Sequence, residues 1–196
     1  MKCLDPDELT SNENYRIMTT VTAPRPIGWI STVDGNGVNN LAPFSHYNNI
    51  CTTVPIVMFS VDPKDDGRIK DTLINIKETE EFVVNGVNES LVIQMEKTAE
   101  NIPANMSEFE YADIEYVESE SVAPRRVADS PFHMECSMYD LLNIYDRTVV
   151  LGEVVRFHTD EDMLTHGKVD VEKLDVVGRL GGKKYTKVRP IDYDNI

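Results

Sequence analysis

The sequence predicts a small, mainly β protein: a β-barrel with appended helices. Several short apolar or alternating runs have the length and composition of strands, and turns containing glycine separate them. Only two segments show the 3.6-residue periodicity of helices, and they do not alternate regularly with the strands. A parallel doubly wound sheet, which needs a helix between successive strands, is therefore disfavoured.

The first two strands form a predicted hairpin. Residues 27–33 (IGWISTV) are rich in β-branched and aromatic side chains, and residues 38–42 return after the turn DGNG. Asp-Gly and Asn-Gly pairs tolerate the positive φ that a tight hairpin requires. After a turn at residues 53–55, the nearly continuous apolar run at residues 56–61 predicts a strand that is buried on both faces.

Two helices and three further strands complete the expected core. Asp71 is the expected N-cap of a helix over residues 71–81, and a second helix is expected from Glu89-Ser90 through Thr98. Strands are expected at residues 82–85, 132–142 and 148–158, with Gly152 at a bulge or bend. Residues 100–124 are acidic and irregular and are interpreted as an insertion. A turn is expected at residues 170–173, and residues 178–188 should end the folded part.

The length of 196 residues and the 41% hydrophobic content suit one domain over residues 1–196, with peripheral arms at 1–14 and 191–196. The first arm should contain at most one short helical turn. No apolar run approaches the roughly 20 residues of a membrane helix, and no secretory signal is visible. The three cysteines are odd in number and widely spaced, which indicates a reducing, cytoplasmic setting without disulfides or a zinc site.

The formal net charge is −15, which makes nucleic-acid and membrane partners improbable because both are anionic. Two interpretations of this acidity stay open. It can serve solubility, or it can be an adaptation to a salt-rich cytoplasm that screens the self-repulsion.

Most motif-based functions find no support in the sequence. The Gly35-x-Gly37 pair lies in a hairpin, and Asn40 stands where a dinucleotide fingerprint has its third glycine. The four histidines are scattered and do not have metal-ligand spacing, and no serine lies in G-x-S-x-G. We therefore predict no metal and no catalytic side chain.

Two segments have the composition of a binding site. Residues 42–48 (APFSHYN) offer hydroxyls, an amide and free backbone groups beside an aromatic ring, which suits a flat ligand with polar edges. Residues 68–72 (RIKDT) place two cations and a hydroxyl at a helix start, where free N–H groups and the helix dipole favour phosphate. Ordinary helix capping with two solvated cations is the alternative for this second segment, and the residues alone leave both open.

Several blocks occur in a specific order: RPIGWISTVDGNG, NLAPFSHYN, DPKDDGRIKDTLINI and EFVVN, followed by SPFHMEC, VVLGEVVRFH and GRLGGKKY. In this combination, over roughly residues 15 to 190, the chain resembles the flavin reductase-like, FMN-binding split-barrel family. The resemblance implies a split β-barrel homodimer with an FMN near each subunit interface.

The resemblance also implies which residues contact FMN. The residues that match the family's A-P-F-S-x-Y-N loop would hold the flavin ring and ribityl chain: Ala42, Pro43, Phe44, Ser45, Tyr47 and Asn48. Ser31 and Thr32 would face the same pocket from the neighbouring strand, and Tyr185 would close over a flavin. A last group would bind or frame the phosphate: Ser60, Arg68, Lys70, Asp71 and Thr72. The chain departs from the family at His46, where relatives commonly carry an aromatic residue such as Phe.

The expected activity is FMN-dependent oxidoreduction, most simply flavin reduction by hydride transfer from NAD(P)H to flavin N5. Because the flavin carries the electrons, this chemistry needs no acid–base pair from the protein. Two other classes stay open: a flavoredoxin-like electron-transfer protein that serves protein partners without nicotinamide turnover, and a β-barrel binding module without flavin. A flavin-using oxygenase or another redox protein is the expected partner.

Overall fold

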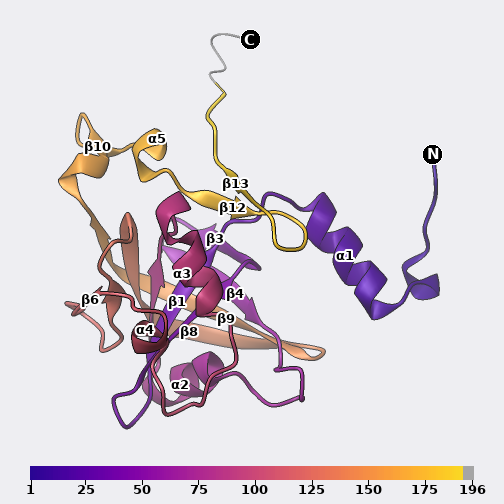
Figure 1. Cartoon of the computed structure of the whole chain (residues 1–196), viewed down its shortest axis with the longest axis horizontal. Helices are drawn as coiled ribbons and strands as arrows, with labels where there is room; N and C mark the ends of the chain where they lie inside the picture. Colours follow the sequence, from indigo (N-terminus) through magenta and orange to yellow (C-terminus); the bar gives the residue numbers. More distant parts are fainter. Residues whose placement is uncertain (192–196) are drawn as a thin grey trace.

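The computed structural model describes residues 1–191, so the predicted C-terminal arm lies outside the described residues except for Ile191. Its centre is an antiparallel sheet with the strand order β2-β1-β5-β8-β9-β4-β3 (Figure 1). The strands are β1 (Gly28–Val33), β2 (Asn39–Phe44), β3 (Tyr47–Cys51), β4 (Ile56–Val61), β5 (Glu81–Asn85), β8 (Phe132–Ile144) and β9 (Arg147–Thr159). The predicted mainly β class with few helices is confirmed.

Short elements surround this sheet. The helices are η1 (Pro6–Glu8), α1 (Ser11–Val21), α2 (Asp71–Thr79), η2 (Glu89–Leu91), α3 (Val92–Lys97), α4 (Glu108–Tyr111), η3 (Glu161–Met163) and α5 (Val171–Leu174). Two-stranded ribbons pair β6 (Tyr116–Val117) with β7 (Arg126–Val127), β10 (Leu164–Thr165) with β11 (Lys168–Val169), and β12 (Val177–Arg179) with β13 (Tyr185–Lys187). No helix of the described chain is long and apolar enough to cross a membrane.

Two clusters of buried side chains form the core. The first joins α2 to the centre of the sheet, and the rings of Phe44, Phe59 and Phe82 meet there at centroid distances of 5.0 and 5.3 Å. The second lies where α3 and α4 cover β1 and β2, around Trp29 and Phe109. Because β2 contributes to both clusters, its backbone is held firmly between α2 and α4.

Gly152 lies in the middle of β9 and contacts an aromatic ring. A Cβ atom at this position would lie 2.2 Å from Cζ of Phe82, whose side chain is fully buried. The register shift that accompanies it falls between Met138 and Asp140 on β8, directly opposite Gly152. The predicted irregularity is therefore present at this level of the hairpin, but the extra residue belongs to the opposite strand.

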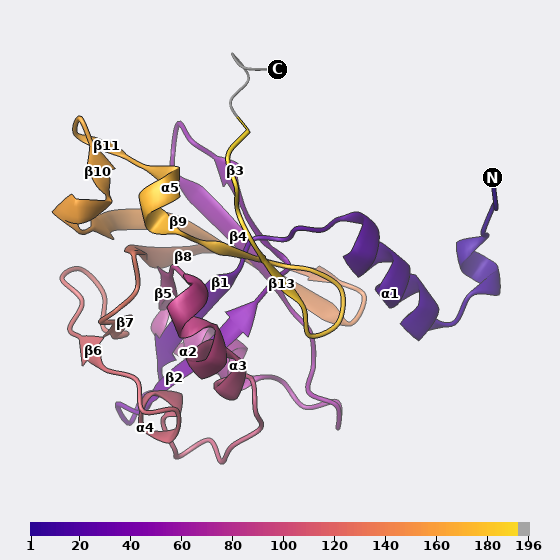
Figure 2. The same ribbon diagram turned by 45° about the horizontal axis from the view of Figure 1, so that its top comes forward.

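The N-terminal arm is more helical than the sequence reading expected. A capping box between Thr10 and Glu13 starts α1, which continues to Val21. Figures 1 and 2 show α1 and the N-terminus to one side of the sheet, clear of most of the body. Met18 and Val21 remain 60% and 71% exposed on this helix.

Two other boundaries differ from the prediction. The second helix begins as the 3₁₀ turn η2, and the side chain of Asn88 rather than Glu89 accepts the capping bond, from the N–H of Leu91. The turn expected at residues 170–173 is the short helix α5, whose N-cap is Asp170. In both places an Asn or Asp oxygen satisfies a free backbone N–H, which is the usual reason for these residues at a helix start.

Candidate functional site

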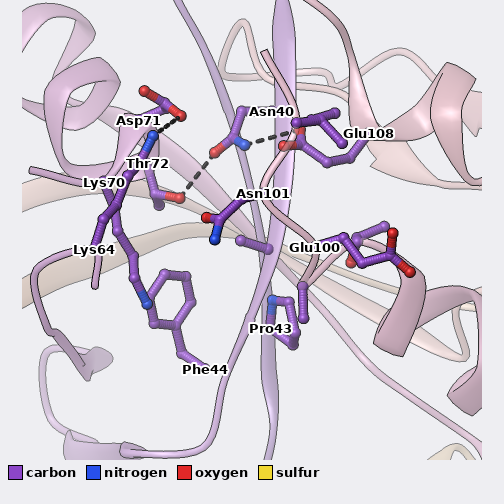
Figure 3. Close-up of a pocket in the computed structure, with 14 residues that line it drawn as sticks. Asn40, Pro43, Phe44, Lys64, Lys70, Asp71, Thr72, Glu100, Asn101 and Glu108 are labelled. Carbon is purple, nitrogen blue, oxygen red and sulfur yellow. Dashed lines mark hydrogen bonds and ion pairs between the residues drawn. The ribbon is translucent and has the colours of Figure 1, made fainter. Parts of the chain in front are cut away.

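A cleft runs along β2 between the start of α2 and the segment that follows α3. We call it the β2 cleft. Its walls come from Asn40 and residues 42–44, from Lys64 and residues 70–72, and from residues 98–102 with Glu108. Figure 3 shows Lys64 and Lys70 on one side of it, Glu100 on the other, and Pro43 and Phe44 at its base. Its volume is about 100 Å³.

The start of α2 forms one end of the β2 cleft. Asp71 is the first helical residue rather than the predicted N-cap; Lys70 is the N-cap, and its side chain makes no capping hydrogen bond. The Asp71 carboxylate instead pairs with Lys64, with a 2.7 Å distance between Nζ and Oδ2. The first turn of α2 therefore keeps backbone N–H groups without a side-chain acceptor, next to two lysines.

Arg68 and Lys70, the two cations of the segment predicted to bind phosphate, lie in different places in the structure. The Nζ of Lys70 lies 3.1 Å from Oδ1 of Asp62 and 5.5 Å from the centre of the Phe44 ring, and Lys70 lines the cleft. The Arg68 side chain is 74% exposed, pairs with Asp66 at 2.7 Å, and does not line the cleft. The structure thus brings Lys70 to this site and leaves Arg68 outside it.

Lys64 lines the β2 cleft, although the sequence did not predict it as a site residue. The turn at residues 64–68 closes through hydrogen bonds from Lys64 N–H to Arg68 O and from Gly67 N–H to Lys64 O. Gly67 has φ +81°, a conformation that favours glycine. This tight turn folds Lys64 back over the start of α2.

A buried chain of polar groups runs from the start of α2 across β2 to α4. Thr72 Oγ1 donates to Asn40 Oδ1 at 2.8 Å, and Asn40 Nδ2 donates to Glu108 Oε2 at 2.8 Å. The N–H of Leu41 donates to the same Glu108 oxygen. Burial raises the pKa of Glu108 despite these bonds. Glu108 belongs to the predicted insertion, which here joins the wall of the site.

A second, larger cavity of about 430 Å³ lies beyond Pro43 and Phe44, which line both spaces. We call it the basic cavity, because Arg25, Arg179 and Lys183 line it and Glu96 is its only acidic lining residue within the described chain. Ser45 is another lining residue, so the predicted segment 42–48 reaches both spaces through Ala42, Pro43, Phe44 and Ser45. Most of this segment is strand rather than loop, since β2 extends to Phe44 and β3 begins at Tyr47.

Other predicted contacts lie in the interior. Ser31 and Thr32 are fully buried, and their hydroxyls are engaged by the backbone oxygen of Arg125 and by the side chain of Asn75. Tyr47 packs against the first core cluster, where burial raises its pKa. None of the three lines either space.

The other residues predicted to contact FMN, Asn48, Ser60 and Tyr185, line neither the β2 cleft nor the basic cavity. Asn48 is exposed on β3, and the Ser60 N–H donates to the backbone oxygen of His46 at 2.9 Å. Burial, with Arg147 and Arg25 nearby, lowers the pKa of the His46 imidazole. Tyr185 bonds to Arg179 and Glu96 behind the basic cavity. Residues 1–191 contain no group of three side chains suited to a metal ion.

Comparison with known proteins shows relatives and solved structures that are similar to this chain over most of its length. Residues 20–173 match the family model described as the flavin reductase like domain. An uncharacterized protein of Aquifex aeolicus is 37% identical over 88% of this chain and 89% of its own length. The crystal structure of nitrilotriacetate monooxygenase component B from Bacillus cereus superposes with a TM-score of 0.92 at 34% identity, covering 98% of both chains. The 2-nitrobenzoate 2-nitroreductase NbaA of Pseudomonas fluorescens gives 0.87 at 29% identity, covering 97% of this chain and 96% of its own.

Proposed function

The chain belongs to the flavin reductase-like family, and we propose that it binds FMN and reduces it with NADH or NADPH. Its fold is accordingly the split barrel of that family, as the sequence reading expected. Flavin-dependent oxidoreduction follows from the family. The proposal goes beyond the family in two respects: the bound flavin is FMN, and a nicotinamide nucleotide is the electron donor.

One observation carries the choice of FMN: the uncapped start of α2 meets Lys64 and Lys70 at one end of the β2 cleft. A phosphate monoester suits these donors, because free helical N–H groups and lysines both stabilise a dianion. A volume of about 100 Å³ accommodates a phosphate but not a fused three-ring system. The flavin ring would therefore extend past Pro43 and Phe44 toward Ser45.

The protein's own residues would act by binding and positioning. Lys64, Lys70 and the first turn of α2 would hold the phosphate, and the Pro43–Phe44 surface would support the ring. Bound flavin would supply the hydride acceptor at N5. The buried Thr72–Asn40–Glu108 chain fixes the β2 backbone beside the site, so the cleft is formed before the ligand arrives.

We also propose a homodimer as the functional unit. Large apolar side chains remain exposed on both strands of the β8–β9 hairpin, where Tyr139 and Phe157 are 61% and 64% exposed. Ile50 near the end of β3 and Val54 in the turn from β3 to β4 are exposed as well. An apolar surface of this kind favours burial against a second copy. A flavin-using oxygenase in the cytoplasm is the proposed recipient of the reduced flavin, as the name of the B. cereus neighbour suggests for that protein.

Flavin titration followed by anaerobic reduction tests the function. FMN added to the purified protein should shift the visible flavin spectrum at a one-to-one ratio, and riboflavin should bind more weakly. NADH or NADPH should then bleach the absorbance without oxygen. Bleaching by neither nucleotide would contradict nicotinamide-dependent reduction and favour an electron carrier, and absence of flavin binding would contradict both.

A further inference from the structure

The basic cavity contains a buried cation without a counter-ion. Arg25 is only 7% exposed. Its guanidinium donates to the backbone oxygens of Thr19 and Leu180 and to Ser45 Oγ, which are all uncharged groups. No carboxylate of the described chain pairs with it. Burial lowers the pKa of the Arg25 guanidinium, Tyr15 opposes this shift, and the second cation Arg179 adds to it. A buried charge without a partner is costly, so this site favours an anion.

The rest of the cavity adds to the positive charge. Arg179 is neutralised by Glu96, with 2.6 Å between Nη1 and Oε1. Lys183 is exposed at the rim and has no acidic partner in the part of the chain that the structure describes. Arg25 and Lys183 are thus two uncompensated cations in a chain of net charge −15. In the β2 cleft, by contrast, Lys64 and Lys70 are both paired with aspartates.

The uncharged walls of the basic cavity suit a planar group. Pro43 and Phe44 line the cavity, and Tyr15 of α1 contributes a further aromatic ring. The volume of about 430 Å³ is in the range of small-molecule sites. An oxyanion at Arg25 would keep an attached ring close to the Pro43–Phe44 surface, where the two spaces meet.

We propose that Arg25 and Lys183 bind the oxyanion of the second substrate, a planar anionic molecule that exchanges electrons with the flavin. This inference rests on the proposed function, and it assigns these residues to substrate selection rather than to the flavin. Two ligand classes share the required chemistry. A nitroaromatic carboxylate would accept two electrons and two protons at its nitro group from the reduced flavin, and a reduced nicotinamide nucleotide, which carries a phosphate, would donate a hydride to the oxidised flavin. Both present a ring joined to an oxyanion.

Calorimetry with matched ligand pairs tests the assignment. The probes are 2-nitrobenzoate against nitrobenzene, and reduced nicotinamide mononucleotide against its dephosphorylated riboside, titrated into FMN-loaded and flavin-free protein. Each pair differs only in its oxyanion. We expect the anionic member of at least one pair to bind at least tenfold more tightly, since a charge-assisted hydrogen bond is worth that much. The pair that shows the difference identifies the class.

Substitutions of Lys183 and Arg25 then test whether these two side chains bind the oxyanion. Lys183→Ala should weaken the anionic ligand severalfold and leave the neutral one unchanged, and Arg25→Gln should weaken it at least tenfold. Lys184→Ala is the matched control, because it removes the same charge from the neighbouring position but Lys184 does not line the cavity. Lys183 is exposed, so its replacement should leave the fold intact even if Arg25→Gln does not fold.

Three outcomes would overturn the assignment. The first is no preference for the anionic member of either pair, and the second is an equal loss in Lys183→Ala and Lys184→Ala. In the third, Lys183→Ala weakens FMN more than riboflavin, which would show that these cations serve the flavin phosphate. Failure of FMN to bind at all would contradict the proposed function instead, and the flavin-free titration would still test the cavity.

Discussion

The Nζ of Lys64 lies 2.7 Å from Oδ2 of Asp71, so the first residue of α2 fixes a lysine beside its own helix N-terminus. A cation held in place loses less side-chain entropy when a ligand arrives than a freely moving one. The pair therefore prepares one end of the β2 cleft for a dianion, although it also lowers the net charge there.

Replacing either cleft lysine should separate phosphate binding from ring binding. Lys64→Ala and Lys70→Ala should each weaken FMN about tenfold and change riboflavin affinity little, because only FMN carries the phosphate. Arg68→Ala is the matched control and should leave both affinities unchanged, since Arg68 is exposed and outside the cleft. Flavin absorbance titrations measure all three. Equal losses for FMN and riboflavin would place the phosphate elsewhere.

A side chain at Gly152 should destabilise the sheet. Gly152→Ala would bring a methyl group against the buried Phe82 ring, and overpacking of this kind costs about 1–3 kcal/mol. At Gly35 the added methyl would meet only the carboxylate of Glu78, which is exposed and can move, so Gly35→Ala should be nearly neutral. Urea unfolding followed by circular dichroism compares the two. Similar free energies of unfolding for both variants would be inconsistent with this packing.

The hydrogen bond from Trp29 Nε1 to Thr98 Oγ1, at 2.9 Å, joins β1 to the wall of the β2 cleft. Thr98→Val should cost about 1–3 kcal/mol, because it leaves the buried indole N–H without an acceptor. Thr98→Ser keeps the hydroxyl and should lose less. Trp29 is the only tryptophan, so the fluorescence emission of its indole reports both on unfolding and on the surroundings of this hydrogen bond. An identical loss in the two variants would show that the bond contributes nothing.

His133 should make stability fall in mild acid. Burial lowers its pKa from 6.5 to about 4 in the folded state, where its ring contacts Val127 O at 2.7 Å. Between these values the unfolded chain binds a proton that the folded chain does not, so stability is lost as pH falls from about 6.5 to 4. The loss should approach 3 kcal/mol, the order of magnitude that such a shift implies.

Chemical unfolding at several pH values tests the role of His133. His133→Gln removes the titrating group and should flatten the dependence in this window, whatever its effect on stability at pH 7. His166→Asn is the control, because His166 is exposed and Asn tolerates its positive φ. An unchanged slope in His133→Gln would assign the acid sensitivity to other groups.

All strands of the sheet except β3 were predictable because their signals are local. Strand β3 has no such signal, because residues 47–51 are largely polar and four of them pair with β4 only in the fold. The hairpin at β1 and β2, the apolar run of β4 and the alternation of β8 each reflect side chains within one segment. Helix α1 was missed, although the Thr10-x-x-Glu13 capping box was a usable signal. The acidic composition of the segment before it favours an exposed arm and makes this signal hard to recognise.

The site was less predictable because it depends on long-range packing. The segment RIKDT marked the correct helix start, but only the turn at Gly67 decides that Lys64 rather than Arg68 reaches the cleft. Nothing in the sequence distinguishes Glu108 from the other acidic residues of the insertion. Its role in the site depends on the packing of α4 against β2. Arg25 becomes a buried cation because α1, β12 and the Ser45 loop meet around it, and no spacing in the sequence shows that meeting.

The position of the β8–β9 hairpin in the sheet has a consequence for the order of folding. Strands β1, β2 and β5 lie on one side of this hairpin and β3 and β4 on the other, so no direct pairing joins the two groups. A ribosome releases all five strands before the hairpin that unites them. We therefore expect nascent chains that end before β9 to remain open to proteases, and the sheet to close late, in a slow step governed by distant contacts.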